Sequence, residues 1–207
     1  MSIEDMIYEG FRRFLVKNLR IYDRNDVIHV SEAIQCLRKS WYSRKFGDRE
    51  LKFLDDRKKV ILGLGLSTHL VLENVLREMG YEVEKEVSKK IGDITLTGTV
   101  DAINSEHVLE LKTINRIPDN PLQHHVLQLN TYLGLTDLKK GYIVYICKRD
   151  GSIKVFEIEF NENLFNIVVE RANELYASLV KNIEPPRDIG FNCSYCEWRE
   201  RCYNESK

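Results

Sequence analysis

The stretch Gly98 to Lys112, GTVDAINSEHVLELK, decides the fold that we expect for this chain. Residues 94–103 alternate between apolar and polar side chains and are rich in β-branched residues, and residues 107–113 resume the alternation. Between them, residues 104–106 (NSE) interrupt the pattern with side chains that favour turns. The sequence therefore predicts two antiparallel strands joined by a tight turn.

Two carboxylates face each other across this predicted hairpin. With the turn centred near residue 105, Asp101 lies opposite residue 109 or 110, which brings it beside Glu110, and Lys112 follows one pleat away. Like charges at facing positions destabilise a sheet, and a divalent cation between them removes that cost. Carboxylate oxygens are the ligands that Mg²⁺ or Mn²⁺ prefers. Taken alone, the pattern fits a metal site and a hairpin with one solvated face equally well.

The composition is that of one soluble globular domain over residues 1–207. Charged residues make up 30% and hydrophobic residues 43% of the chain. The formal net charge of −1 excludes a generally basic nucleic-acid binder, so any such binding uses a local patch. The acidic first ten residues do not resemble a signal peptide, and the longest apolar run, Val60 to Leu72, is too short to span a membrane. We therefore expect a cytoplasmic protein.

Hydrophobic periodicity predicts further helices and strands on both sides of the hairpin. Strands are expected over 81–89, 141–148 and 152–160, the last two joined by Asp150-Gly151. Helices are expected over 3–20, from Ser31 to about 46, over 59–79, from Pro121 to about 133, and from Asn161 to about 182. The N-caps that we expect are Ser31, Asn120 and Asn161.

The second predicted helix mixes basic and aromatic side chains, which suits contact with a single nucleic-acid strand. The same mixture also fits a helix with a solvated basic face and aromatic residues in the core. Both interpretations stay open for this set: Arg38, Lys39, Trp41, Tyr42, Arg44, Lys45 and Phe46.

Two other groups of polar residues lie at helical spacing. His69 and Glu73 are four residues apart, so they share a helix face just before the hairpin. They form either a structural hydrogen bond or part of a metal site. His125, Gln128 and Tyr132 lie on one side of an otherwise apolar helix. These three residues either bond within the fold or face a site.

Four of the five cysteines form a candidate metal set. Cys193, Cys196 and Cys202 lie close together near the end of the chain, and Cys36 would be a fourth ligand from the other end. Four thiolates can hold Zn²⁺ or an iron–sulfur cluster, and a single C-x2-C pair favours the cluster. Cys147 lies inside a predicted strand and is expected to be a buried apolar residue.

Taken in order, these motifs resemble those of the RecB-like nucleases of the PD-(D/E)xK superfamily, and among them the CRISPR-associated iron–sulfur exonucleases. The resemblance covers nearly the whole chain. The residues that match the family motifs are Gly65, His69 and Glu73; Gly98 to Asp101; Glu110 to Lys112; Gln128 and Tyr132 with His125; and Cys36, Cys193, Cys196 and Cys202. Two departures are Val100 before the aspartate and Leu37 after the first cysteine, where many members have proline.

The resemblance implies an α/β fold with a restriction-endonuclease-like core, a mixed central sheet flanked by helices. It implies an iron–sulfur clasp joining the termini, formed by residues 30–46 and 185–207, with 4Fe–4S ahead of 2Fe–2S and zinc as the fallback. The implied ligands of Mg²⁺ or Mn²⁺ are His69, Asp101, Glu110 and the carbonyl of Leu111.

The same resemblance implies roles for other side chains and a substrate. Lys112 would position or activate water. Gln128 and Tyr132 would hold DNA or shape the site, and Arg38 and Tyr42 would touch the DNA strand. The implied activity is exonuclease cleavage of mainly single-stranded DNA, 5′ to 3′, during CRISPR spacer acquisition beside the integrase complex. A homo-oligomer is left open. Two alternatives also remain: a non-catalytic DNA-binding or scaffold subunit, and a repair nuclease of the same fold.

Overall fold

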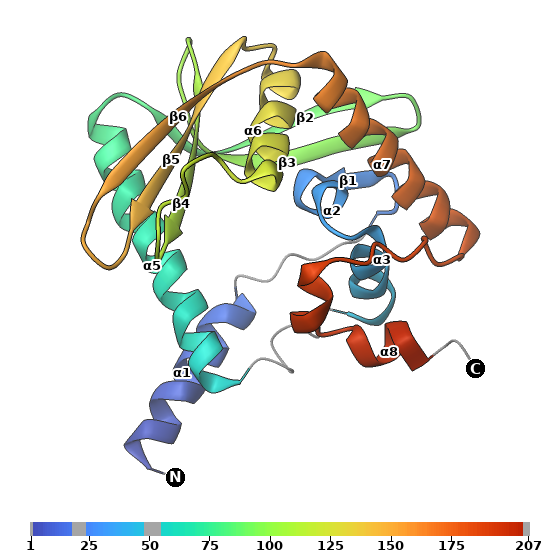
Figure 1. The fold of residues 1–207 in the computed structure, drawn as a ribbon, viewed down its shortest axis with the longest axis horizontal. Helices are drawn as coiled ribbons and strands as arrows, with labels where there is room; N and C mark the ends of the chain where they lie inside the picture. Colours follow the sequence, from blue (N-terminus) through green and yellow to red (C-terminus); the bar gives the residue numbers. More distant parts are fainter. Residues whose placement is uncertain (1, 18–23, 48–54, 205–207) are drawn as a thin grey trace.

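A computed structural model describes residues 2–17, 24–47 and 55–204, and it is built around a six-stranded mixed sheet (Figure 1). The strands are β1 (Val27–His29), β2 (Glu82–Ile91), β3 (Ile94–Ile103), β4 (Val108–Ile114), β5 (Lys140–Cys147) and β6 (Ile153–Glu159). The helices are α1 (Ile3–Lys17), α2 (Val30–Ile34), α3 (Leu37–Phe46), α5 (Asp56–Glu78), α6 (Gln123–Thr136), α7 (Glu162–Lys181) and α8 (Arg199–Asn204), with a 3₁₀ turn, η1 (Phe191–Tyr195), before α8.

The predicted hairpin is confirmed, including its register. β3 and β4 are antiparallel, with Ala102 opposite Leu109 and Ile103 opposite Val108. Extending this register by one residue places Asp101 opposite Glu110. The turn is closed by the Asn104 side chain. Its Oδ1 accepts hydrogen bonds from the backbone N–H groups of Glu106 and His107, at 2.9 Å each. The strands expected over 81–89, 141–148 and 152–160 are β2, β5 and β6.

The second predicted helix differs from the prediction in its continuity and in its start. The second helix is interrupted after α2, since Arg171 of α7 donates to the carbonyls of Ala33 and Gln35 at 2.7 and 2.6 Å. Its N-cap is His29 rather than Ser31, with the Glu32 carboxylate accepting from the His29 N–H.

The helix expected from Pro121 begins two residues later. Leu122, not Asn120, is the N-cap of α6, and the Leu122 N–H donates to the Tyr145 hydroxyl at 3.0 Å. The Asn161 cap of α7 and the long helix α5, here capped by Asp55, are confirmed. For the first helix, α1 ends at Lys17, and the predicted residues 18–20 lie outside the described part of the chain.

β3 organises the sheet because three strands pair with it. β2 follows one edge of β3 along its length. On the other edge, β1 pairs with residues 95–97 and β4 with residues 102 and 103. Among the described strands, residues 98–101 therefore have no partner on that edge. The sheet is open at the position of Asp101, and we call this opening the notch.

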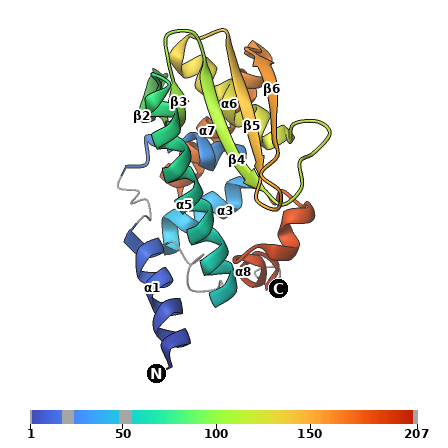
Figure 2. The same cartoon turned by 90° about the vertical axis from the view of Figure 1, so that its left-hand side faces the viewer.

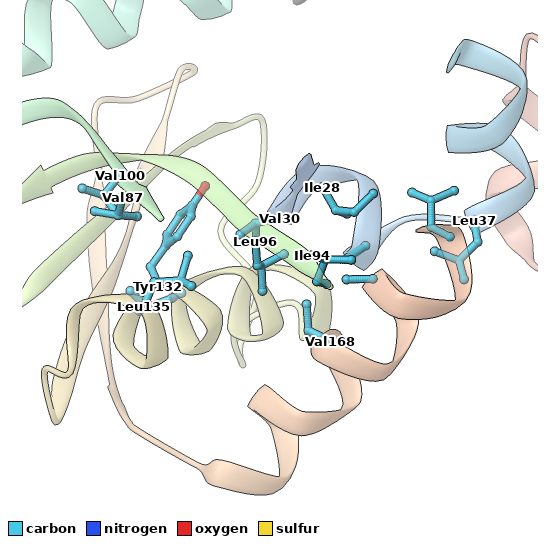
Figure 3. Packing of buried hydrophobic residues seen from close by; sticks show 14 of the residues in the cluster. Ile28, Val30, Leu37, Val87, Ile94, Leu96, Val100, Tyr132, Leu135 and Val168 are labelled. Carbon is cyan, nitrogen blue, oxygen red and sulfur yellow. The ribbon is translucent and has the colours of Figure 1, made fainter. Parts of the chain in front are cut away.

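Beside the notch, the side chains of β2 and of β3 switch from one face of the sheet to the other at the same level. Val87 and Val100 pack in the main core with Tyr132 of α6, as Figure 3 shows, whereas Val83 and Ala102 pack with Leu76 of α5. Residues 83 and 87, like 100 and 102, would share a face in a regular strand. Both strands are thus rotated between these positions, which separates a core under α6 from a smaller one under α5.

α5 extends beyond the sheet, and α1 packs against its protruding half (Figure 2). The contact is close, since a Cβ added at Gly63 would lie 2.6 Å from the Phe11 ring. By length and composition alone, the 23-residue α5, which contains the apolar run Val60 to Leu72, could cross a membrane. In the fold, however, α5 packs on β2, β3 and β4 and carries His69 to the sheet.

Candidate active site

The notch brings Asp101 and the β4 residues together. The Asp101 carboxylate fills the place of a missing ladder bond, because its Oδ2 accepts from the Leu111 N–H at 2.6 Å. The other oxygen, Oδ1, lies 3.8 Å from Nδ1 of His69 on α5. The structure therefore brings two of the predicted metal ligands, His69 and Asp101, to one opening. For Leu111, it shows that the backbone is held by Asp101 through the N–H.

Glu110 and Lys112 are buried side by side on the α6 face of β4. Only 1% of Glu110 is exposed, and its Oε1 accepts a short hydrogen bond from the Lys112 ammonium. Oε2 is buried and has no hydrogen-bond partner among the described residues. A buried carboxylate oxygen without a partner is costly, so it marks a position suited to a cation or a donor supplied by a ligand.

The electrostatics of the notch are dominated by burial and like charge. Burial, followed by the nearby Asp101 carboxylate, raises the pKa of Glu110 to about 8. Burial acts to lower the pKa of Lys112, but the carboxylates of Glu110 and Asp101 outweigh it, and the net shift is upward. Without a cation, the notch therefore disfavours the charge on Glu110 and favours the charge on Lys112.

A cavity of about 530 Å³ lies between α5, α1 and the sheet beside the notch. His69 and Glu73 both line it, as the helical spacing predicted, together with Glu84 of β2 and Thr113 of β4. Glu73 is buried, and one of its oxygens lies 3.6 Å from the Arg77 guanidinium, so it has a structural ion pair. His69 is the member of the pair that reaches Asp101.

The polar stripe on α6, formed by His125, Gln128 and Tyr132, faces inward. The Gln128 side chain donates to the Tyr132 hydroxyl at 3.2 Å, and Tyr132 is buried against Gly98. His125 hydrogen-bonds Tyr145 of β5 at 2.7 Å, and burial, followed by the charge on Lys112, lowers its pKa to about 3. The alternative that these residues bond within the fold is therefore confirmed, and Tyr132 also packs against Gly98 at the notch.

The four predicted cysteine ligands line a second cavity, of about 440 Å³, between α3 and the C-terminal segment. They are Cys36, Cys193, Cys196 and Cys202. Burial raises the pKa of Cys196, and the neighbouring Cys36 adds to that shift. Cys147 is buried in β5, as predicted. The C-terminal segment is joined to α3, rather than to the N-terminal helix α1 (Figure 1).

The basic and aromatic residues of α3 hold the fold together, which corrects the expectation that Arg38 and Tyr42 touch DNA. Arg38 donates to the Pro185 carbonyl at 2.7 Å, and the Tyr42 hydroxyl donates to Glu184 at 3.0 Å. Tyr42 is fully buried and stacks near Trp198. Arg44 forms a buried ion pair with Glu32 at 2.6 Å. The aromatic residues Trp41 and Tyr42 lie in the core as the structural interpretation predicted, but the basic side chains are paired within the fold rather than solvated.

Two residues near the notch were missed by sequence reasoning. The Tyr145 hydroxyl accepts a hydrogen bond from the Leu122 N–H and forms another with His125. The alternation of β5 could have predicted that Tyr145 lies on the inner face of the sheet. Glu84 has no such signal, because it is one of several glutamates on β2. Within the described part of the chain, no three His, Cys, Asp or Glu side chains are gathered closely enough to hold an ion by themselves.

Comparisons with known proteins agree with this arrangement. The model of the PD-(D/E)XK nuclease superfamily matches residues 19–203. The CRISPR-associated exonuclease Cas4 of Saccharolobus solfataricus is 28% identical over 201 residues, which cover 92% of this chain and 94% of that protein.

Two solved structures share the fold. The crystal structure of SSO0001 superposes with a TM-score of 0.75 at 23% identity, covering 100% of this chain and 99% of that one. An alkaline exonuclease from Laribacter hongkongensis gives a TM-score of 0.55 at 15% identity, covering 78% of this chain and 91% of that one.

Proposed function

Because the chain belongs to the PD-(D/E)XK nuclease superfamily and is a Cas4-like nuclease of the RecB family, we propose that it is a metal-dependent exonuclease that acts mainly on single-stranded DNA, from the 5′ end. The observation that carries the proposal is the notch. There, the sheet opens at Asp101, opposite the buried pair of Glu110 and Lys112. A binding or scaffold subunit has no need for a buried carboxylate with an unpaired oxygen.

The donor set at the notch fits Mg²⁺ or Mn²⁺, which nucleases of this superfamily use. The residues that would hold the ion are Asp101, Glu110 and His69, with the Leu111 carbonyl as a further oxygen. The unpartnered Oε2 of Glu110 supports this assignment, since oxygen ligands suit hard cations. When bound, the cation polarises the scissile phosphate and makes a water molecule more acidic.

Lys112 would act as a fixed positive charge in the reaction. Its pKa is raised, which favours the protonated ammonium, so the role that we propose for it is that of a positive charge rather than of a base. Instead, it donates hydrogen bonds and offsets the negative charge that develops on the phosphate oxygens as water attacks. Its bond to Glu110 holds the ammonium in place and leaves its other hydrogens available to substrate.

Gln128 and Tyr132 would shape the notch rather than grip DNA directly. Tyr132 is buried beneath Gly98, and its hydroxyl is held by Gln128. This contact supports the backbone of β3 just before Asp101. A rigid support matters because a displacement of about 1 Å at a catalytic group can cost about 100-fold in rate.

An iron–sulfur cluster held by Cys36, Cys193, Cys196 and Cys202 would tie the C-terminal segment to α3. The four thiols around one cavity support this proposal, because a Cys₄ set suits such a cluster, with zinc as the alternative. Its contribution would be to stability. Visible absorbance in anaerobically purified protein, lost in Cys193→Ala, tests it; colourless protein that contains zinc would contradict the cluster.

The biological setting that we propose is trimming of DNA during CRISPR spacer acquisition in the cytoplasm, in association with the integrase complex. The likeness to the Cas4 exonuclease of S. solfataricus supports it. In this setting the whole of residues 1–207 acts as one nuclease domain.

Single-stranded DNA labelled at either end tests the activity and its direction. With Mn²⁺ or Mg²⁺, the 5′ label is expected to be released first in short products, and EDTA is expected to stop cleavage. Release of the 3′ label first would reverse the polarity. Faster cleavage of duplex than of single strands would contradict the proposed substrate.

A further inference from the structure

The backbone of Glu84 is unusual for its place in the fold. Its φ is +49°, inside strand β2. The other non-glycine residues with positive φ in the described part of the chain are Asp137 and Asn182, which are the C-caps of α6 and α7. A left-handed residue is common at a helix end but unfavourable for glutamate inside a strand. A conformation of this kind is kept when the surrounding structure, or function, requires it.

Glu84 lies directly across from Asp101. In the ladder of β2 with β3, Val83 pairs with Ala102 and Lys85 with Val100, and these neighbours leave residues 84 and 101 facing each other. This is the one position where the ladder between residues 82–91 and 94–103 lacks a pair. Asp101 is therefore flanked by a break on both edges of β3, with Glu84 on one side and the notch on the other.

Glu84 shares a cavity with other charged and ligating side chains, including Lys148. It lines the cavity of about 530 Å³ together with His69 and Glu73. Its charge adds to the repulsion felt by Glu110, after the contributions of burial and Asp101. Like charges this close destabilise a sheet when no cation is present. Independently of Glu84, the buried Oε2 of Glu110 has no hydrogen-bond partner among the described residues, which points to a ligand at this centre.

We infer that Glu84 is a third carboxylate of the cation site, and that it holds a divalent cation jointly with Asp101. Its left-handed backbone turns the strand at this level, so that the side chain faces the cavity rather than following the alternation of β2. A glycine would allow the same turn with less strain. The presence of glutamate there indicates that its side chain makes an interaction that glycine would lose. The inference rests on the proposed function, because it assigns one more ligand to the same centre.

The test is Mn²⁺ binding, measured by titration calorimetry in the absence of DNA. Glu84→Gln removes the charge and keeps the shape, and it is expected to weaken Mn²⁺ binding about 10- to 100-fold. Glu84→Gly relieves the backbone and removes the carboxylate, and it is expected to weaken binding equally while folding at least as well as wild type. The matched control is Glu86→Gln, on the same strand opposite Thr99, which is expected to bind Mn²⁺ as wild type does.

The outcomes separate this inference from the proposed function. Wild-type affinity in both Glu84 variants, with binding lost in Glu110→Gln, would overturn the inference and leave the nuclease proposal intact. Absence of Mn²⁺ binding and cleavage in the wild-type protein would overturn both. Should Glu84→Gln unfold, as judged by circular dichroism, Glu84→Gly still decides the matter.

Discussion

The notch and the cysteine region both gather charged and ligating side chains, but they satisfy them differently. Around the cysteines, the basic residues of α3 have protein partners, such as Arg38 on the Pro185 carbonyl and Lys39 on Glu197. In the notch, Glu110 keeps one oxygen without a partner, and His69 lies 3.8 Å from Asp101, too far for a hydrogen bond. The basic residues of α3 thus hold the protein together, whereas the polar groups of the notch are arranged for a ligand.

This difference predicts opposite responses to substitution. Changes in the notch should remove activity and leave folding intact. Changes around α3 should lower stability and leave the chemistry of the remaining folded protein unchanged.

The largest effect is expected for Lys112→Ala. Removing the charge that offsets the developing negative charge on phosphate should lower the cleavage rate about 100- to 1,000-fold. The measurement is single-turnover cleavage of single-stranded DNA with Mn²⁺. The exposed Lys85→Ala is the control and should cleave as wild type does. Undiminished cleavage by a folded Lys112→Ala protein would remove Lys112 from the mechanism.

Arg44→Ala should give the largest loss of stability among these changes. The Arg44 and Glu32 side chains are only 4% and 2% exposed, so the change leaves a buried carboxylate without its partner. We expect unfolding free energy to fall by about 3–5 kcal/mol, measured by urea denaturation. The control Arg12→Ala breaks an exposed ion pair with Glu9 and should change the unfolding free energy little. Equal losses in the two variants would contradict the structural role of the buried pair.

Gly98→Ala should affect both properties, because it lies between the notch and the core. A Cβ at this position would lie 2.6 Å from the Tyr132 ring, so the ring or β3 must shift. We expect a loss of about 1–3 kcal/mol in unfolding free energy together with slower cleavage. Gly10→Ala, whose Cβ would meet nothing within 4 Å in α1, should be neutral or stabilising. Wild-type stability and cleavage in Gly98→Ala would show that the Tyr132 contact is dispensable.

The pH dependence of metal binding sharpens the comparison further. The pKa of Glu110 is raised to about 8, so below that pH a cation must displace a proton from this carboxyl. The Mn²⁺ association constant should therefore rise with pH by up to about tenfold per unit between pH 6 and 8, and level off above 8. A flat profile over this range, measured by titration calorimetry, would place the cation away from Glu110.

The same pKa shift acts on the stability of the metal-free protein. The folded-state pKa lies above the ordinary value of 4.5, so the favourable contribution of protonated Glu110 is complete below pH 4.5. It is lost as pH rises to about 8, and bound Mn²⁺ should offset that loss.

Much of the hairpin could be predicted from sequence because its determinants are local. Alternation, the NSE turn and the facing carboxylates all lie within residues 94–113, and the register followed from the turn. The end of α2 and the start of α6 could not be predicted, since Arg171 and Tyr145 reach them from distant segments. The role of Arg38 was misjudged for the same reason, because its partner Pro185 lies 147 residues away.

The opening of the sheet was also beyond sequence reasoning. It depends on where β1 and β4 stop pairing with β3, which only the assembled sheet defines. Glu84 illustrates the limit most clearly, because a left-handed glutamate has no signature in the sequence of β2.

The most direct test of the account compares Glu110→Gln with Glu106→Gln from the exposed turn of the same hairpin. Cleavage of 5′-labelled single-stranded DNA would be measured with Mn²⁺ and with EDTA, after circular dichroism confirms folding. We predict metal-dependent shortening by wild type and Glu106→Gln and none by Glu110→Gln. Cleavage at the wild-type rate by Glu110→Gln, or cleavage by wild type that EDTA does not stop, would contradict the assignment of the notch as the active site.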